Sequence, residues 1–175
     1  MSSILQNLLL AEHSKAQATK VVNWVGHSPA RFNELITVFL GTDKLLVQRA
    51  AWPLSYAAEA HPDLLQKHIG KLIRNLRRPA LHDAVKRNTL RCFRNIPVPK
   101  RYQGEMMNAC FDFIIAPAEK PAIKAFSLAI LANLAREYPD IRAEIKTIIE
   151  EKWDLESPAF RSQARKLLKS SMANG

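Results

Sequence analysis

Apolar residues recur along this chain with the period of an amphipathic helix. In the segment 61–76, HPDLLQKHIGKLIRNL, the aliphatic side chains fall on one side of a helix drawn at 100° per residue. They are Leu65, Ile69, Leu72, Ile73 and Leu76. Similar segments fill most of the 175 residues, and only five glycines and 7% aromatic residues argue against a sheet-rich fold. The pattern therefore predicts an all-α protein.

The predicted helices come in pairs that repeat along the chain. The first helices of four successive pairs begin at Val47, Val85, Ile123 and Phe160, which gives steps of 38, 38 and 37 residues. Matching Pro79-Ala80-Leu81 with Pro121-Ala122-Ile123 instead gives a step of 42, so the register of the third repeat stays open. An earlier pair fits at a shorter step. The expected repeats are roughly 14–41, 42–78, 79–117, 118–154 and 155–172, all within a single domain spanning 1–175.

Prolines and serines mark the expected helix starts, because a proline at the first helical position loses no hydrogen bond. The prolines expected to open second helices are Pro29, Pro62 and Pro139, and those expected to open later first helices are Pro121 and Pro158. Ser28 and Ser157 directly precede two of these prolines and are expected to act as N-caps.

Four of the first helices share the same opening. VQRAAWPL, VKRNTLRC, IKAFSLAI and FRSQARKL each begin with an apolar residue followed by a basic or polar one. In this they resemble the first helices of HEAT or armadillo-type repeats. Asp43 and Asp83 lie where HEAT repeats often carry an acid, and Pro53 matches the proline of such first helices. The resemblance covers about Lys15 to Lys169. It implies a right-handed α-solenoid of about four to five stacked HEAT-like hairpins, which bury their apolar stripes only by stacking on one another.

The same resemblance implies roles for three basic residues near the starts of first helices. In HEAT repeats, the position after the first aliphatic residue often pairs with an acid of a neighbouring repeat. Lys86, Lys124 and Arg161 occupy this position. We therefore expect these three side chains to stabilise the fold rather than to bind a partner.

The formal net charge of +10 comes from one part of the chain. Residues 64–101 carry eleven Lys or Arg and one acid, Asp83, whereas the remainder is balanced at fifteen against fifteen. An excess of this kind favours an acidic partner: nucleic acid, an anionic protein surface or a phosphorylated ligand.

Part of this charge forms a stripe on the second helix of its pair. Lys67, Lys71, Arg74 and Arg78 follow at intervals of four, three and four, opposite the apolar stripe, provided that the helix continues to Arg78. The HEAT resemblance places this face on the concave surface; the alternative is an ordinary solvated helix face. Arg77, Lys100 and Arg101 could join the stripe. The candidate binding residues are therefore Lys67, Lys71, Arg74, Arg77, Arg78, Lys100 and Arg101.

The corresponding faces of the other second helices are polar or acidic. They carry Asn33, Glu34 and Thr37, then Glu105, Asn108 and Asp112, and finally Glu144, Thr147 and Glu151. A surface that follows duplex phosphates should be positive along its length, so this pattern favours a limited acidic target. We predict a non-catalytic protein-binding scaffold whose partner carries an acidic segment. One alternative is a HEAT-like protein that binds nucleic acid, with or without a relation to the alkylpurine DNA glycosylases. The other is that the positive charges only keep the protein soluble.

The chain offers little catalytic chemistry. Its glycines are isolated, and no catalytic motif of the glycosylases can be matched to it. His61 and His68 have no third ligand spaced to join them, so we expect neither a metal nor a cofactor. Two cysteines suit a reduced, cytoplasmic protein. The longest mainly apolar run, 126–135, is too short to cross a bilayer.

Overall fold

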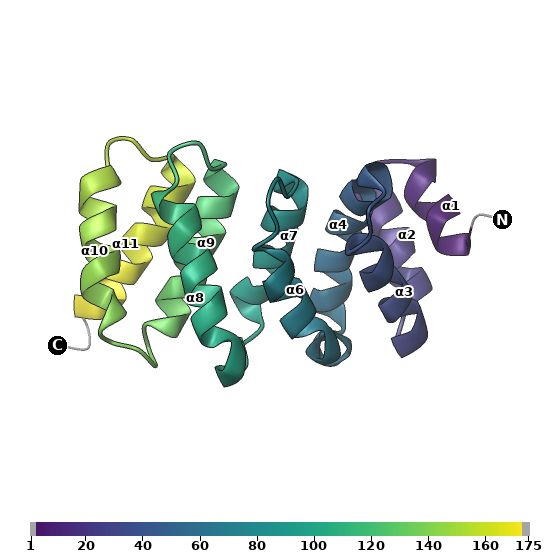
Figure 1. Ribbon diagram of the computed structural model, residues 1–175, viewed down its shortest axis with the longest axis horizontal. Coiled ribbons are helices and arrows are strands. Elements are labelled where there is room, and N and C mark those ends of the chain that lie inside the picture. The colour runs from purple at the N-terminus through teal and green to yellow at the C-terminus, as the bar shows by residue number, and fades with distance from the viewer. Residues whose placement is uncertain (1–2, 173–175) are drawn as a thin grey trace. The chain divides into compact units, whose positions relative to one another are not determined.

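The computed structural model describes residues 3–172, and of 170–172 it describes the backbone alone. These residues form helices and no strand, which confirms the predicted all-α fold (Figure 1). No helix within them is both long and apolar enough to span a bilayer. The chain divides into two compact units, the first ending at Pro97 and the second beginning at Val98. This boundary falls between the two helices expected to form the third pair.

The first unit is built around one long helix, α4. Its helices are α1 (Ile4–Ala11), α2 (Lys15–Val25), α3 (Pro29–Phe39), α4 (Lys44–Ala60), α5 (Pro62–Leu65), α6 (Ile69–Asn75) and α7 (Asp83–Asn95). Between α5 and α6, Gln66–His68 form a 3₁₀ turn. α4 packs against α1, α2, α3 and α7, so most of the apolar surface of this unit is buried around it.

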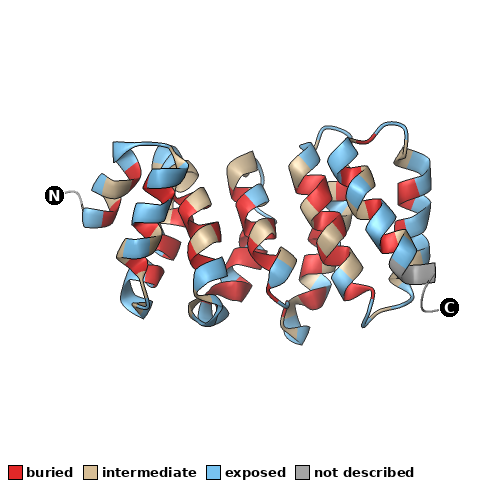
Figure 2. Ribbon diagram, turned by 180° about the vertical axis from the view of Figure 1, so that it is seen from behind, coloured by how far each residue is buried: buried red, intermediate tan, exposed pale blue. Residues whose placement is uncertain are grey.

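The second unit has a central helix of the same kind. It contains α8 (Lys100–Ile115), α9 (Pro121–Leu134), α10 (Ile141–Lys152) and α11 (Pro158–Met172). α9 packs against both α8 and α11, and α10 contacts α11. In both units the buried residues line the sides of the helices that face their neighbours (Figure 2).

The predicted helix starts are mostly confirmed. Pro29, Pro62, Pro121 and Pro158 are the first residues of α3, α5, α9 and α11. The Ser28 hydroxyl accepts the Arg31 amide at 3.3 Å, and the Ser157 hydroxyl accepts the Phe160 amide at 3.2 Å. Pro139 is the exception, because α10 begins two residues later at Ile141.

The helix starts also settle the register of the third repeat. Val85, Ile123 and Phe160 are each the third residue of their helix, and all three are fully buried. Pro79 lies in a turn ahead of α7 and opens no helix. The steps of 38 residues from Val85 to Ile123 and of 37 from Ile123 to Phe160 are therefore correct, and the alternative step of 42 is wrong. Val47 is the fourth residue of α4 and half-buried, one position out of this register.

The segment 61–76 does not form the single helix that its periodicity predicted. Its aliphatic stripe is buried as expected, but the 3₁₀ turn interrupts the helix and α6 ends at Asn75. His68, within this turn, is buried with its ring centroid 5.8 Å from that of Phe32. His68 lies three residues after Leu65 and four before Leu72, so helical phase already placed it on the apolar side.

Candidate functional site

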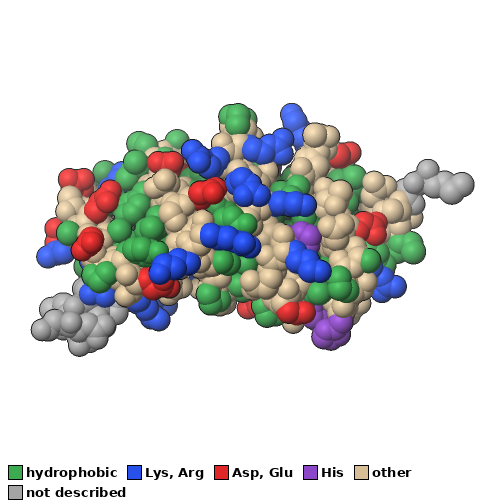
Figure 3. Space-filling model, turned by 60° about the horizontal axis from the view of Figure 1, so that its bottom comes forward, with side chains coloured by type: hydrophobic (Ala, Val, Ile, Leu, Met, Phe, Trp, Pro, Cys, Tyr) green, Lys and Arg blue, Asp and Glu red, His purple; other side chains and the backbone are tan. Residues whose placement is uncertain are grey.

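Five exposed cations follow one another from the 3₁₀ turn to the end of α6 and beyond. We call them the basic segment: Lys67, Lys71, Arg74, Arg77 and Arg78. In Figure 3, Lys and Arg side chains gather over the region of α6 in the centre of the view. None of the five forms an ion pair with another described residue. The five positive charges are therefore not neutralised by nearby acids of the described residues, and they can attract an anionic partner.

The C-terminal end of the basic segment differs from the prediction. α6 does not continue to Arg78; the Arg77 amide donates to the Arg74 carbonyl at 3.2 Å and the Arg78 amide to the Asn75 carbonyl at 3.1 Å, as in successive turns. The Arg78 guanidinium folds back to within 3.4 Å of the Asn75 side-chain oxygen. Arg78 is therefore presented by a turn, and the helical stripe ends at Arg74.

His68 lies between the first two cations of the basic segment. It lines a pocket of about 420 Å³ together with Pro29, Asn33, Asp63, Leu64 and Lys67. Burial, followed by the charges of Lys71 and Lys67, lowers the pKa of the imidazole below its ordinary value. Lys67 and Lys71 therefore lie close to His68, whose imidazole is neutral at pH 7.

The two other cations of the candidate set belong to the second unit. Lys100 and Arg101 are the first two residues of α8, and both are exposed. The Arg101 guanidinium lies 4.8 Å from the centroid of the Tyr102 ring. That they act together with the basic segment stays a prediction.

The acidic and polar faces predicted for the other second helices are solvent-facing. Asn33, Asn108, Asp112 and Glu144 are exposed, and Glu34 and Glu105 are half-buried. Asp112, considered from sequence as a possible general base, is an exposed carboxylate on the polar side of α8.

The roles implied for Lys86, Lys124 and Arg161 are confirmed in one case. Lys124 forms a buried ion pair with Glu156 of the following repeat. Lys86 lies 3.7 Å from Asp83 of its own helix, and Arg161 donates to the Trp153 carbonyl. Asp83 belongs to the same helix as Lys86, so a pairing of Lys86 with an acid of a neighbouring repeat stays a prediction.

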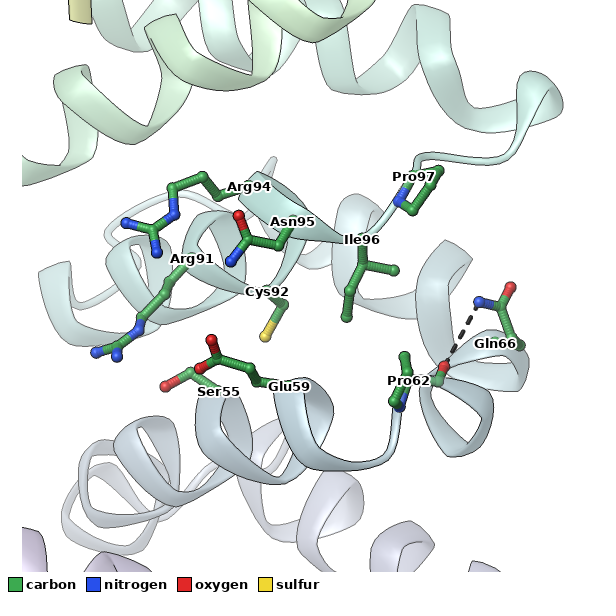
Figure 4. A pocket seen from close by; sticks show the side chains of 10 residues that line it. All are labelled: Ser55, Glu59, Pro62, Gln66, Arg91, Cys92, Arg94, Asn95, Ile96 and Pro97. Carbon is green, nitrogen blue, oxygen red and sulfur yellow. Dashed lines mark hydrogen bonds between the residues drawn. The ribbon is translucent and has the colours of Figure 1, made fainter.

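A pocket of about 290 Å³ lies between α4 and α7 (Figure 4). Glu59 comes from α4 and Cys92 from α7, and Arg91 lies 4.7 Å from the Tyr56 ring centroid at one side. Burial raises the pKa of the Cys92 thiol to about 12, and the thiol donates to the Asn88 carbonyl at 3.2 Å. Cys92 is therefore a protonated thiol and a poor nucleophile.

The histidines do not form the metal site that two of them could have suggested. His61 contacts His27, with 4.4 Å between ring centroids, whereas His68 packs on Phe32. Across residues 3–172, no three His, Cys, Asp or Glu side chains are grouped so that they could hold a metal ion.

Comparison with known proteins agrees with the paired helices. The family model of the HEAT repeat domain matches residues 5–171. No match was found among curated proteins or among solved structures. The family match gives no support to a relation with the alkylpurine DNA glycosylases. Since the match takes in nearly the whole chain, the protein belongs to the HEAT repeat family, as its first helices predicted, and has an α-solenoid fold.

Proposed function

We propose that this protein is a non-catalytic scaffold whose first unit binds an acidic segment of a partner protein through the basic segment. HEAT repeats generally serve as protein-interaction scaffolds, and this general role supports a scaffold function for the protein. The observation that carries the finer proposal is the row of five exposed cations without an ion pair among the described residues. An acidic peptide would supply the missing counter-charges.

A protein partner fits the basic segment better than a nucleic-acid duplex. The face of α3 that corresponds to α6 presents Asn33, Glu34 and Thr37, which carry no positive charge. A duplex offers phosphates along its whole length, so its binding surface should extend over successive repeats. A cationic surface confined to one repeat matches a short acidic segment.

Direct binding measurements test this proposal. Fluorescence anisotropy with a labelled octaglutamate peptide and with a labelled DNA duplex compares the two ligand classes on the full chain. We expect octaglutamate to bind, with an affinity that falls as salt is raised. The double variant Lys71→Glu/Arg74→Glu should weaken binding by about tenfold or more.

A matched reversal provides the control. Lys15→Glu/Lys20→Glu makes the same change in net charge on exposed residues of α2. The control should bind octaglutamate within about twofold of the wild type if location matters more than total charge. Equal losses in both double variants would overturn the proposal, as would tighter, reversal-sensitive binding of the duplex.

A further inference from the structure

A third pocket, of about 620 Å³, lies beside the end of the basic segment, where α4 and α7 begin. Its lining combines the end of α3 and the start of α4 with the turn that follows α6 and the start of α7. The lining residues are Phe39, Gly41, Thr42, Lys44, Leu45, Val47, Gln48, Asn75, Arg78, Pro79, Ala80, Leu81, His82 and Val85. Arg78 therefore belongs both to the basic segment and to this pocket.

The less exposed part of the lining is mainly apolar, with Asn75 and Gln48 as its polar members. Phe39 and Val85 are buried, Val47 and Leu81 are half-buried, and Leu45 is 50% exposed at the rim. A concave apolar lining with a few polar groups is typical of binding sites, because burying a large side chain there removes apolar surface from water. The pocket is thus suited to a large apolar side chain.

The rim of the pocket is cationic. Lys44 and Arg78 are both exposed, and neither forms an ion pair with a described residue. The nearby acids are engaged: the Asp43 carboxylate accepts the Leu46 amide at 3.0 Å, and Asp83 lies 3.7 Å from Lys86. An apolar group flanked by carboxylates would therefore match both the interior and the rim.

The chain itself displays a group with this chemistry. Leu155, in the turn between α10 and α11, is 85% exposed, the most exposed of the large hydrophobic side chains of the described residues. Asp154 beside it and Glu151 before it are exposed as well, and neither forms an ion pair with a described residue. The end of α10 and the turn after it thus present an exposed leucine with two carboxylates close to it in the sequence, which complements the pocket in polarity and charge.

We propose that the Leu155 turn of one copy of the protein docks into the pocket at the starts of α4 and α7 of a second copy. Leu155 would enter the apolar interior while Asp154 and Glu151 face Lys44 and Arg78. Because the two surfaces differ, the contact is heterologous, and it propagates head to tail unless the copies close into a ring or exchange turns reciprocally. Each copy of the protein thus contributes one pocket and one Leu155 turn to self-association.

Sedimentation velocity of the full chain over a range of concentrations tests the proposal. We expect the mean mass to rise with concentration and the rise to weaken with salt. Two single-site variants should each weaken association by about tenfold or more. Leu155→Ser removes the docking side chain from an exposed position, and Gln48→Trp fills the pocket from a half-exposed position without changing its charge.

Mixing the variants gives the sharpest result. At concentrations where the wild type associates but each variant alone is monomeric, an equimolar mixture of the two variants should form a 1:1 heterodimer, because one intact pocket then meets one intact turn. Leu10→Ser is the matched control, since Leu10 is 47% exposed on α1 and lies outside the pocket. Circular dichroism melts confirm that each variant is folded.

A wild-type protein that stays monomeric at all concentrations would overturn the inference. So would association that persists in Leu155→Ser, or a mixture that stays monomeric. Leu155→Ser leaves the basic segment intact, so at protein concentrations too low for self-association its octaglutamate binding should equal that of the wild type. Sedimentation velocity therefore tests self-association, and fluorescence anisotropy with octaglutamate separately tests binding of an acidic peptide.

Discussion

Lys124 of α9 and Glu156, which precedes α11, form an ion pair inside the second unit. The Lys124 Nζ lies 2.5 Å from the Glu156 Oε1, and the two side chains are 5% and 7% exposed. The pair joins the fourth repeat to the fifth. Because both charges are removed from water, each depends on the other for its stabilisation.

Removing one member of this pair should be strongly destabilising. We expect Lys124→Met to lower the free energy of unfolding of the second unit by about 3–5 kcal/mol, because Glu156 is left as an uncompensated buried charge. The double variant Lys124→Met/Glu156→Leu should recover much of the loss, since it removes both charges. Urea denaturation followed by circular dichroism measures the three proteins.

An exposed pair in the same unit provides the control. Lys146 and Glu150 lie 3.7 Å apart on α10, with side chains 62% and 63% exposed. Lys146→Met should change the unfolding free energy by no more than about 0.5 kcal/mol. If Lys124→Met and Lys146→Met lowered the free energy of unfolding by similar amounts, burial would not make the Lys124–Glu156 pair more important to stability than an exposed pair.

His68 should make the stability of the first unit depend on pH. Its pKa is lowered in the folded protein, so below about pH 6.5 the unfolded chain binds a proton that the folded chain resists. The free energy of unfolding should therefore fall as pH drops through this range, by at most about 1.4 kcal/mol per pH unit. His68→Leu should reduce this dependence in urea denaturation at about pH 7.5 and 5.5. An unchanged pH profile in the variant would assign the effect to other groups.

The helical repeat could be predicted from sequence because its signals are local. Val85, Ile123 and Phe160 recur at the same helical position, and prolines stand at most helix starts. The 3₁₀ turn at Gln66–His68 could not be predicted in this way. It accompanies the packing of His68 on Phe32, a contact between residues far apart in the chain. A helical periodicity continues through the turn, so the pattern alone gives no sign of the break.

The candidate site was predictable only in part. Charge counting found the basic segment, and the HEAT resemblance predicted an acid partner for Lys124 without identifying Glu156. The pocket at the starts of α4 and α7 could not be found, because its lining comes from two separate parts of the chain, 39–48 and 75–85, that meet only in the fold. Its only local sign was the turn Pro79-Ala80-Leu81, which resembled a helix start.

The two cysteines should report the opening of each unit separately. Burial raises the pKa of both Cys92 and Cys110 to about 12, so in the native protein they are protonated and shielded near pH 8. We expect iodoacetamide to modify them at least about 100-fold more slowly in the native state than in urea. Mass spectrometry of the peptides distinguishes Cys92, in the first unit, from Cys110, in the second. Fast labelling of either thiol in the native protein would contradict its burial.

Gly26 and Ala80 both adopt a positive φ, and exchanging glycine and alanine there should have opposite effects. Gly26 has φ 50° and ψ −139°, and an added Cβ would meet only the Asn23 carbonyl oxygen, at an ordinary 3.6 Å. The cost of Gly26→Ala is therefore conformational, and we expect a loss of about 1–2 kcal/mol. Ala80 has φ 54°, so Ala80→Gly should relieve strain and raise stability by up to about 1 kcal/mol, after the greater entropy of glycine in the unfolded chain is counted. Urea midpoints of the two variants measure both changes, and a stable Gly26→Ala protein would show that the backbone can relax at this turn.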